Sequence, residues 1–510
     1  MSAQQNSPPA IESVKDSAGH VHELVEPPIG EGGQGRVYCT KDPEVLIKFA
    51  CRDGVIVEDE EAHRHYGHRF DRLLEMDLQG IQLAAPETVL AAPYCGYSMR
   101  LLRDMEAIST LIVPNGQDLA EGYISSGGLR RRLAVLTALA RVLARLHALP
   151  AAYGDISPNN LFISTDQRRA SAWLIDADNM HLICDEEPSA FTPGYVSPEL
   201  ATNGRSSTES DSFGFACLAF HILCQHEAFN RGEEHFESWS CSQTNSQDAD
   251  AGEEWLVAGG PWVHDEVDPL KQVPGIPWNL TCSSSLRKNF SQTFGLGRLD
   301  RSKRLSMQRW VEVLQQASDA LVTCTGCGWS YFMSQKCCPL PECQTPRPGY
   351  LLWEIRRWDP DLDAGPTDPG TGYRFTQEMT ETLDSLREEN GSTTSSPPTA
   401  LGFIVTNADG HEESVLTTRH CFATRLAQTV HEEVGVAIHN GRVFLTRSNA
   451  RDSRFHIARA DGRTETLTAV CDLRVSEADR DRWYLHCGDM NKPHRILIPR
   501  WVAPAGGVAP

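Results

Sequence analysis

Short apolar runs separated by polar turns mark the chain from Val21 to about Met105. The runs VYCT and VLIKFA have the composition of β-strands, and a helical segment, EDEEAHRHYGHRFDRLLEM, interrupts them. We therefore predict a small β-rich lobe with one helix over residues 21–100. Residues 1–20 are polar, contain prolines and show no periodicity, which predicts a flexible tail.

After residue 104 the pattern changes to that of buried helices. The stretch LRRRLAVLTALARVLARLHAL has apolar residues at i, i+3, i+4 and i+7, and DSFGFACLAFHILC is a second apolar helix candidate. These patterns predict a mainly helical lobe over residues 104–320. The polar and acidic composition of residues 230–277 predicts a surface insertion within it.

The C-terminal part of the chain returns to alternating apolar and polar residues. The Ser, Thr, Gly and Pro content of residues 385–400 predicts a linker. Turn signals at Asp409-Gly410 and Asp461-Gly462 divide the alternating runs of residues 401–503. We predict a small β-rich domain there, and we assign it to binding or regulation because it contains no recognisable nucleophile and base.

Length and charge limit the architecture and the function. Because hydrophobic cores stop growing near ~250–300 residues, a chain of 510 residues should contain two or three domains. Its formal charge of -21 argues against nucleic acid and anionic membranes as partners. No apolar run is long enough to span a bilayer or to act as a signal peptide, so we expect a cytoplasmic protein.

A glycine-rich turn precedes a strand lysine. The segment IGEGGQGRVY places Gly30, Gly32 and Gly35 in the pattern G-x-G-x-x-G-x-V, which ends at Val37. Glycines at these positions let backbone N–H groups approach phosphate oxygens, an approach that a Cβ would obstruct. Lys48 follows on the run VLIK, where it can point towards the same phosphates. A plain turn and a solvated lysine are the alternative interpretation.

Three oxygen-bearing side chains follow further along the chain. Asp155 and Asn160 lie in D-x-x-x-x-N spacing, and LIDAD then supplies Asp176. A carboxylate can take or orient the proton of an acceptor hydroxyl, while an amide and a second carboxylate can hold magnesium against phosphates. The alternative is that these are turn-forming residues.

Together these motifs make residues 21–320 resemble the protein-kinase superfamily. The segment FTPGYVSPEL resembles the substrate-binding loop that ends in Ala-Pro-Glu, here Ser197, Pro198 and Glu199. The resemblance implies that Asp211 supports the catalytic loop and that Arg304 pairs with Glu199. It also implies an α+β, two-lobed protein-kinase-like fold that binds ATP and Mg²⁺ and phosphorylates a protein.

The same resemblance assigns a nucleotide pocket. Met99 would be the gatekeeper, Arg100 to Leu102 the hinge whose backbone meets adenine at Leu101, and Val37 the cover of the base. The alternative for Met99 is a packed strand methionine.

Several positions depart from the kinase pattern. Tyr153 and Gly154 replace the His-Arg that usually precedes the catalytic aspartate, so control by an activation-loop phosphate is not expected. Ser157 replaces a lysine, and Asp-Phe-Gly has become Asp176-Ala177-Asp178. Four carboxylates are candidates for the ion pair with Lys48, namely Glu58, Glu60, Glu61 and Glu75. Of these we favour Glu61.

These variants resemble a bacterial group of eukaryotic-type Ser/Thr kinases. Its members are associated with a von Willebrand A-type protein of the tellurium-resistance class and with a metal-dependent protein phosphatase, which implies a role in bacterial signalling or stress response. Two alternatives stay open. One is a nucleotide-binding pseudokinase scaffold, and the other is a small-molecule phosphotransferase of the aminoglycoside or choline kinase type.

A cysteine cluster follows the helical lobe at residues 321–347. Cys324 and Cys327 form one close pair, Cys338 and Cys343 a second, and Cys337 is an alternative ligand. Four thiolates can bind a tetrahedral structural Zn²⁺, so we predict a zinc-ribbon-like segment. Reduced thiols or a redox pair are the alternatives.

Within the C-terminal domain, GRVFLTRSNARDSRFH weakly resembles forkhead-associated phosphothreonine readers. Arginine and serine side chains there would suit a phosphate. A solvated, charged hairpin is the alternative.

Overall fold

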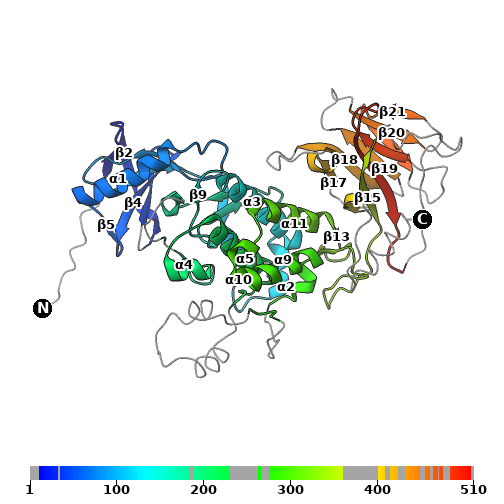
Figure 1. Ribbon diagram of the computed structural model, residues 1–510, viewed down its shortest axis with the longest axis horizontal. Coiled ribbons are helices and arrows are strands. Elements are labelled where there is room, and N and C mark those ends of the chain that lie inside the picture. Colours follow the sequence, from blue (N-terminus) through cyan, green and yellow to red (C-terminus); the bar gives the residue numbers. More distant parts are fainter. Residues whose placement is uncertain are drawn as a thin grey trace, which may run out of the picture.

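The computed structural model describes residues 11–32, 35–182, 189, 191–229, 262–265, 275–359, 400–407, 414–422, 431–439, 442–447, 454–459, 463–468, 470–474 and 483–506. Figure 1 shows three regions along the chain: an N-terminal sheet with a helix, a helical body, and a pair of C-terminal sheets. The mixture of α and β elements agrees with the predicted fold class, and the N-terminal sheet is consistent with the N-lobe of a kinase.

The N-terminal sheet is antiparallel throughout. Helix α1 (Glu60–Glu75) packs on it and begins at Asp59, whose carboxylate accepts a hydrogen bond from the Ala62 N–H. In spatial order the strands are β1 (Ser13–Lys15), β2 (Val21–Glu31), β3 (Gly35–Thr40), β4 (Val45–Arg52), β7 (Gly96–Arg100) and β6 (Pro86–Val89), with β5 (Val55–Ile56) paired to β4.

Strand β1 also bonds to the other end of this sheet. The Ser17 N–H donates to the Val89 carbonyl and the Ala91 N–H donates to the Lys15 carbonyl, both at 2.8 Å. Next to this contact Asp16 is buried, and it accepts a hydrogen bond from Thr88. The prediction of a flexible tail is therefore wrong for Ser13–Lys15, because backbone bonds on two sides hold this segment.

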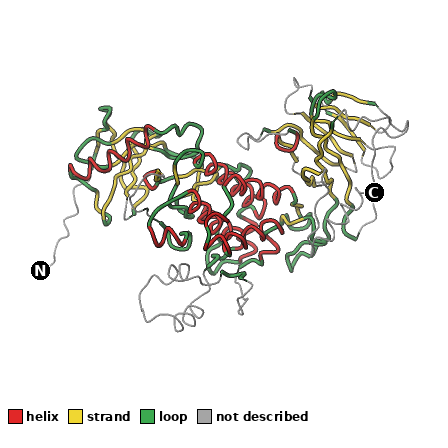
Figure 2. Tube along the Cα trace, in the orientation of Figure 1, coloured by secondary structure: helices red, strands yellow, loops and turns green. Residues whose placement is uncertain are grey.

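The helical body has one large core, and Figure 2 shows its helices in red. Helices α3 and α5 match the two predicted buried helices. The helices are α2 (Leu119–Ser125), α3 (Gly128–Leu146), α4 (Pro198–Asn203), α5 (Thr208–Cys224), α8 (Trp278–Thr281), α9 (Ser284–Phe294), α10 (Leu296–Leu299) and α11 (Met307–Asp319). Short 3-10 turns occur at Ile108–Leu111, Ala177–Asn179 (η2) and Arg301–Lys303.

Small β-elements join the sheet to this body. Strand β10 (Leu161–Ser164) pairs with β8 (Met105–Ala107) and β11 (Ala172–Leu174), and β9 (Ala151–Ala152) pairs with β12 (His181–Leu182).

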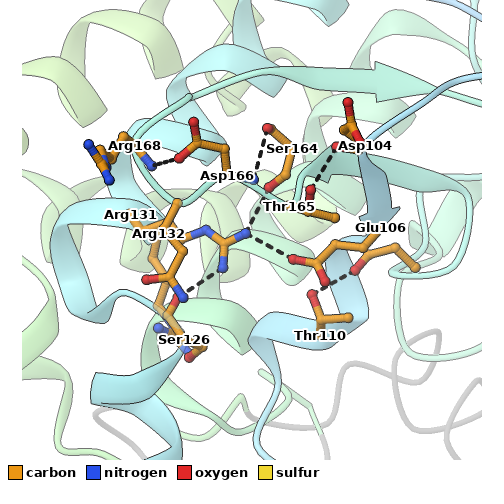
Figure 3. Close-up of polar contacts among 12 residues, drawn as sticks. Asp104, Glu106, Thr110, Ser126, Arg131, Arg132, Ser164, Thr165, Asp166 and Arg168 are labelled. Carbon is orange, nitrogen blue, oxygen red and sulfur yellow. Dashed lines mark hydrogen bonds and ion pairs between the residues drawn. The ribbon is translucent and has the colours of Figure 1, made fainter.

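Arg131 of α3 fastens β8 and β10 to the helical body (Figure 3). Its guanidinium lies 2.9 Å from the Glu106 carboxylate and donates to the Ser164 carbonyl at 2.8 Å and to the Ser126 carbonyl at 3.1 Å. Charge-assisted bonds of this kind are the stronger ones in proteins. The segment that leaves the predicted hinge is therefore anchored to the strand that follows the Asp155 loop.

The predicted surface insertion is wrong at Trp262 and Val263. Both are buried, and the Trp262 ring packs against Phe220 and Trp278. Their apolar side chains are part of the hydrophobic core of the helical body. The rest of the predicted insertion lies outside the described residues, apart from His264, Asp265 and residues 275–277.

The C-terminal part contains two sheets that share a core including Trp353, Val436 and Leu485. The linker predicted at 385–400 lies outside the described residues, except for Ala400. The six-stranded sheet has the order β16 (Ala400–Asn407), β15 (Tyr350–Trp358), β24 (His494–Val502), β23 (Trp483–Cys487), β20 (Phe455–Arg459) and β21 (Thr464–Thr466). The four-stranded sheet has the order β17 (Ser414–Thr417), β18 (Glu432–His439), β19 (Arg442–Arg447) and β22 (Cys471–Arg474).

The start predicted for this region, residue 401, is too late. Strand β15 pairs with both β16 and β24, so the sheet takes in chain from Tyr350 onwards. The nine residues of β15 do not alternate between apolar and polar side chains. The sequence pattern therefore did not reveal this strand.

The C-terminal sheets contact the helical body through apolar residues such as Leu352 and Val405, which belong to its core, and through polar and charged groups. Asp319, at the end of α11, pairs with Arg419 and lies 3.3 Å from His420, both on α14 (Thr418–Cys421). The Thr323 N–H of β13 (Leu321–Thr323) donates to the Asn407 side chain at 3.2 Å. Within the described part of the chain, no helix has the length and apolarity needed to cross a membrane.

Candidate active site

Lys48 lies between two aspartates. It extends from β4, its side chain is 6% exposed, and its Nζ is 2.6 Å from Asp178 Oδ1 and 3.1 Å from Asp176 Oδ1. The hydroxyl of Tyr97 donates to the same Asp178 oxygen at 3.0 Å. The structure thus brings together the predicted residues Lys48 and Asp176, pairs the lysine with Asp178 of the same motif, and adds Tyr97.

The electrostatics of this group favour a charged lysine. Burial opposes its charge, but Asp178 and Asp176 together raise the pKa of Lys48. Burial also works against the Asp178 carboxylate, yet the Lys48 charge and the Tyr97 hydroxyl hold its pKa below the usual range. For Asp176, burial raises the pKa, Lys48 opposes the shift, and the Asp178 charge adds to it.

The prediction that Glu61 pairs with Lys48 is wrong. Glu61 is exposed in the first turn of α1, and within the described residues the ion pairs of Lys48 are with Asp176 and Asp178. The helix turns apolar residues such as Ala62 and Phe70 inwards.

Both oxygens of Asp155 are hydrogen-bonded. Thr192 donates to Oδ1 and the Asn160 amide nitrogen donates to Oδ2, each at 2.8 Å. Burial raises the pKa of Asp155 above its usual value, and these two hydrogen bonds offset only part of that rise. The sequence gives no sign of the role of Thr192 in the segment FTPGYVSPEL, because no spacing rule distinguishes it from a loop threonine.

Asp211 supports the loop that carries Asp155. Its two oxygens accept the Tyr153 and Gly154 backbone N–H groups at 2.7 and 2.9 Å, which is the role the kinase resemblance implies. The Tyr153 hydroxyl contacts the Asn160 carbonyl at 3.0 Å and also the Ile175 carbonyl. These contacts fix the Asp155 loop against the strand that leads to Asp176.

Gly154 is required by the backbone. Its φ is +94°, and an added Cβ would lie 2.7 Å from the Asn179 carbonyl oxygen. The arginine that kinases usually carry here is therefore excluded by geometry in this chain.

The Glu199–Arg304 ion pair is confirmed. Arg304 Nη2 lies 2.8 Å from Glu199 Oε2 and Nη1 lies 2.5 Å from Oε1, which is a bidentate arrangement. The pair ties the start of α4 to the segment before α11.

The predicted glycine loop is a hairpin beside Lys48. Gly30 pairs with Val37 across β2 and β3, and the Gly32 N–H donates to the Gly35 carbonyl at 2.9 Å. A Cβ on Gly35 would lie 2.7 Å from Lys48 Cε. A Cβ at position 35 would therefore displace the end of the Lys48 side chain, whether or not a phosphate is bound.

Two of the predicted adenine contacts lie on β7 or directly after it. Met99 is 6% exposed on β7 and pairs with Leu46. The Leu101 N–H already donates to the Glu44 carbonyl at 2.8 Å. The Leu101 N–H is therefore occupied, and the Leu101 carbonyl is the backbone group that could accept a hydrogen bond from an adenine base.

The four predicted cysteine ligands converge. The Sγ atoms of Cys324, Cys327, Cys338 and Cys343 all lie within 4.8 Å of one another, and this group could hold a metal ion. Cys337 instead turns its Sγ towards the Gln344 side chain, at 3.6 Å.

In the phosphothreonine-reader segment, Arg442 forms an ion pair with Asp472. The Arg454 guanidinium lies 4.3 Å from the centre of the Phe422 ring, and His456 contacts Thr466 at 3.3 Å. Gly441 and Ser453 lie outside the described residues. These contacts do not assemble a phosphate site from the described members of the segment.

Comparisons with known proteins bear on this geometry. The chain is 27% identical over 207 residues to the serine/threonine-protein kinase pkn2 of Myxococcus xanthus, and 24% identical over 204 residues to the serine/threonine-protein kinase PknE of Mycobacterium bovis. These similarities support assignment of the matched part of the chain to the protein-kinase superfamily.

Further comparisons limit this kinase assignment to part of the chain. The chain is 25% identical over 233 residues to the protein STRUBBELIG-RECEPTOR FAMILY 2 of Arabidopsis thaliana. The three matches take in 38–43% of this chain and only 23–33% of the relatives' own lengths. No family model matches the chain.

Proposed function

We propose that this chain is a protein kinase that transfers the γ-phosphate of ATP to a serine or threonine of a protein substrate. The observation that carries the proposal is the convergence of Lys48 and Asp176, 3.1 Å apart, with the Asp155–Asn160 pair. A backbone bond of 3.0 Å from Ile175 to Asn160 holds the two halves together.

The donor set suits Mg²⁺-ATP. The Asn160 amide nitrogen bonds to Asp155, which leaves the amide oxygen for a cation, and the Asp176 side chain is 31% exposed. Carboxylate and amide oxygens are the ligands that a hard cation prefers. When bound, ATP supplies the phosphoryl group, and Mg²⁺ neutralises the negative charge that develops on that group.

The chain's own residues then have distinct roles. The Lys48 ammonium binds the α- and β-phosphates, and Asp155 orients the acceptor hydroxyl or takes its proton. Gly30, Gly32 and Gly35 cover the phosphates, while Val37, Met99 and Leu101 line the base.

A protein substrate fits better than a small molecule. The Glu199–Arg304 pair and Asp211 build the platform on which kinases dock a peptide, and small-molecule phosphotransferases generally lack this set. Partnership with a von Willebrand A-type protein and a phosphatase, and action in the cytoplasm, belong to the same proposal.

Phosphosite mass spectrometry after incubation with Mg²⁺-ATP and a generic acceptor protein tests the proposal. Wild type and Glu61→Gln should transfer phosphate, whereas Lys48→Met and Asp155→Asn should lose at least about 10²-fold in rate. Phosphorylation of an aminoglycoside or amino alcohol and of no polypeptide would contradict it.

A nucleotide-binding scaffold is the second candidate. Buried Ser157 stands where kinases carry a lysine that touches the γ-phosphate, and Ala177 replaces the phenylalanine of the magnesium motif. Intact nucleotide binding by a wild type that transfers nothing would favour the scaffold.

We also propose structural zinc at Cys324, Cys327, Cys338 and Cys343. Two of the Sγ–Sγ distances are 3.6 Å, between Cys324 and Cys343 and between Cys327 and Cys338. A tetrahedron with Zn–S bonds of about 2.3 Å has edges of about 3.8 Å, which these two distances approach.

A further inference from the structure

Helix α1 offers no carboxylate to Lys48. Its inward face carries Ala62, Tyr66 and Phe70, spaced four residues apart, and none of these side chains is a carboxylate. All its acidic residues are exposed, namely Glu60, Glu61, Asp71 and Glu75.

Asp178 lies where a counter-ion is needed. It is the nearer of the two carboxylates to Lys48, at 2.6 Å, and its side chain is 20% exposed against 31% for Asp176. Asp178 lies in the short turn η2, directly after the predicted magnesium ligand Asp176 and Ala177.

Tyr97 orients Asp178 from the neighbouring strand. Tyr97 and Lys48 are paired residues of β7 and β4, so their side chains lie on the same face of the sheet. The buried Tyr97 hydroxyl donates to the Asp178 oxygen that faces Lys48. On its other side, the Tyr97 ring meets Phe70 of α1 edge-on, with centroids 4.9 Å apart.

We propose that Asp178, held by Tyr97, is the positioning residue that fixes Lys48 for the phosphates, in place of a carboxylate from α1. The proposal rests on the proposed function, because it assigns Lys48 to nucleotide phosphates. Helix α1 then acts on the site through the Phe70–Tyr97 ring contact instead of an ion pair. The competing role for Asp178 is ligation of a second metal.

A double-mutant cycle separates the two roles, with the affinity for a fluorescent ATP analogue in Mg²⁺ as the readout. Asp178→Asn should weaken binding about tenfold in the wild-type background and less than about twofold in Lys48→Met, because its effect passes through the lysine. Asp176→Asn, the metal-ligand variant, also removes an ion pair with Lys48, but it should still weaken binding by more than about twofold in the Lys48→Met background, because its contact with the metal does not need the lysine.

Two further variants keep the test decisive if Asp178→Asn folds poorly. Tyr97→Phe retains the ring contact with Phe70 and removes only the donor to Asp178, so it should weaken binding about threefold, again only when Lys48 is present. Glu61→Gln should have no effect.

Equal losses from Asp178→Asn in both backgrounds, or a loss from Glu61→Gln as large as that from Asp178→Asn, would overturn the proposal. A wild type that binds the analogue without transferring phosphate would defeat only the transfer claim. A wild type that binds no nucleotide would defeat both.

Discussion

The cysteine cluster and the Lys48 site are built over very different lengths of chain. Cys324 and Cys343 are separated by 19 residues, whereas Lys48 and Asp178 are separated by 130. In the cluster, two short turns are enough to bring the ligands together. In the Lys48 site, the partner of each side chain depends on how an entire helix and sheet pack. Sequence spacing can therefore identify the members of both sites, but it identifies the pairing only where closure is local.

Substitution of a cluster cysteine should have the largest effect on stability. Cys338 is fully buried, so Cys338→Ser should abolish binding of the proposed zinc and lower the free energy of unfolding by about 4 kcal/mol or more. Zinc content by elemental analysis and denaturant unfolding measure both effects. Cys337→Ser is the matched control and should change neither; equal losses from the two variants would show that the cluster is not a local four-thiol site.

A charge buried by long-range contacts should have the next largest effect. Asp16 accepts bonds from His22 and Thr88, and although burial opposes its charge, these bonds lower its pKa to about 2. Because the folded pKa is depressed, the resulting stability is present above the unfolded pKa near 4 and is lost as the pH falls towards 2.

Asp16→Asn should therefore cost about 2 kcal/mol at pH 7 and almost nothing near pH 2. Unfolding midpoints of the two proteins across this pH range check the prediction. A pH-independent difference would mean that Asp16 acts by packing and not by charge.

A methyl group on the glycine hairpin tests the closeness of the hairpin to Lys48. Gly35→Ala places a Cβ 2.7 Å from Lys48 Cε and should weaken nucleotide binding about tenfold by displacing the lysine. On helix α1 an added Cβ at Gly67 meets no atom within 4 Å, so Gly67→Ala is the matched control in the same titration. Similar losses from both variants would show that the contact with Lys48 is not the cause.

The smallest effect concerns a residue that sequence spacing did not reveal. Thr192→Val removes the donor to Asp155 Oδ1 without much change in size, and it should lower kcat about fivefold with KM for ATP unchanged. Thr192→Ser should restore most of the rate. A rise in KM alone would place Thr192 in nucleotide binding instead.

The sequence predicted the residues of the candidate site better than their contacts. Glycine spacing and the D-x-x-x-x-N pattern selected Lys48, Asp155, Asn160 and Asp176, which the structure brings together. The sequence pattern could not select Tyr97, because a tyrosine on a buried strand is ordinary until its register beside Lys48 is known.

For the fold, periodicity predicted the buried helices but not the exceptions to local pattern. Strand β1 is polar and short, so its place in the sheet comes from backbone bonds with distant residues. Trp262 fell within the predicted insertion because residues 240–254, upstream of it, are polar and acidic, whereas its neighbours in space are aromatic. In both cases tertiary contacts overrode the local composition.

A crystal structure of the wild-type chain with Mg²⁺ and a non-hydrolysable ATP analogue would test the central claim most directly. We predict phosphate oxygens on Lys48 Nζ, the metal on Asn160 and Asp176, and Asp178 still paired with Lys48. A nucleotide bound elsewhere, or these side chains directed at separate ligands, would contradict the account.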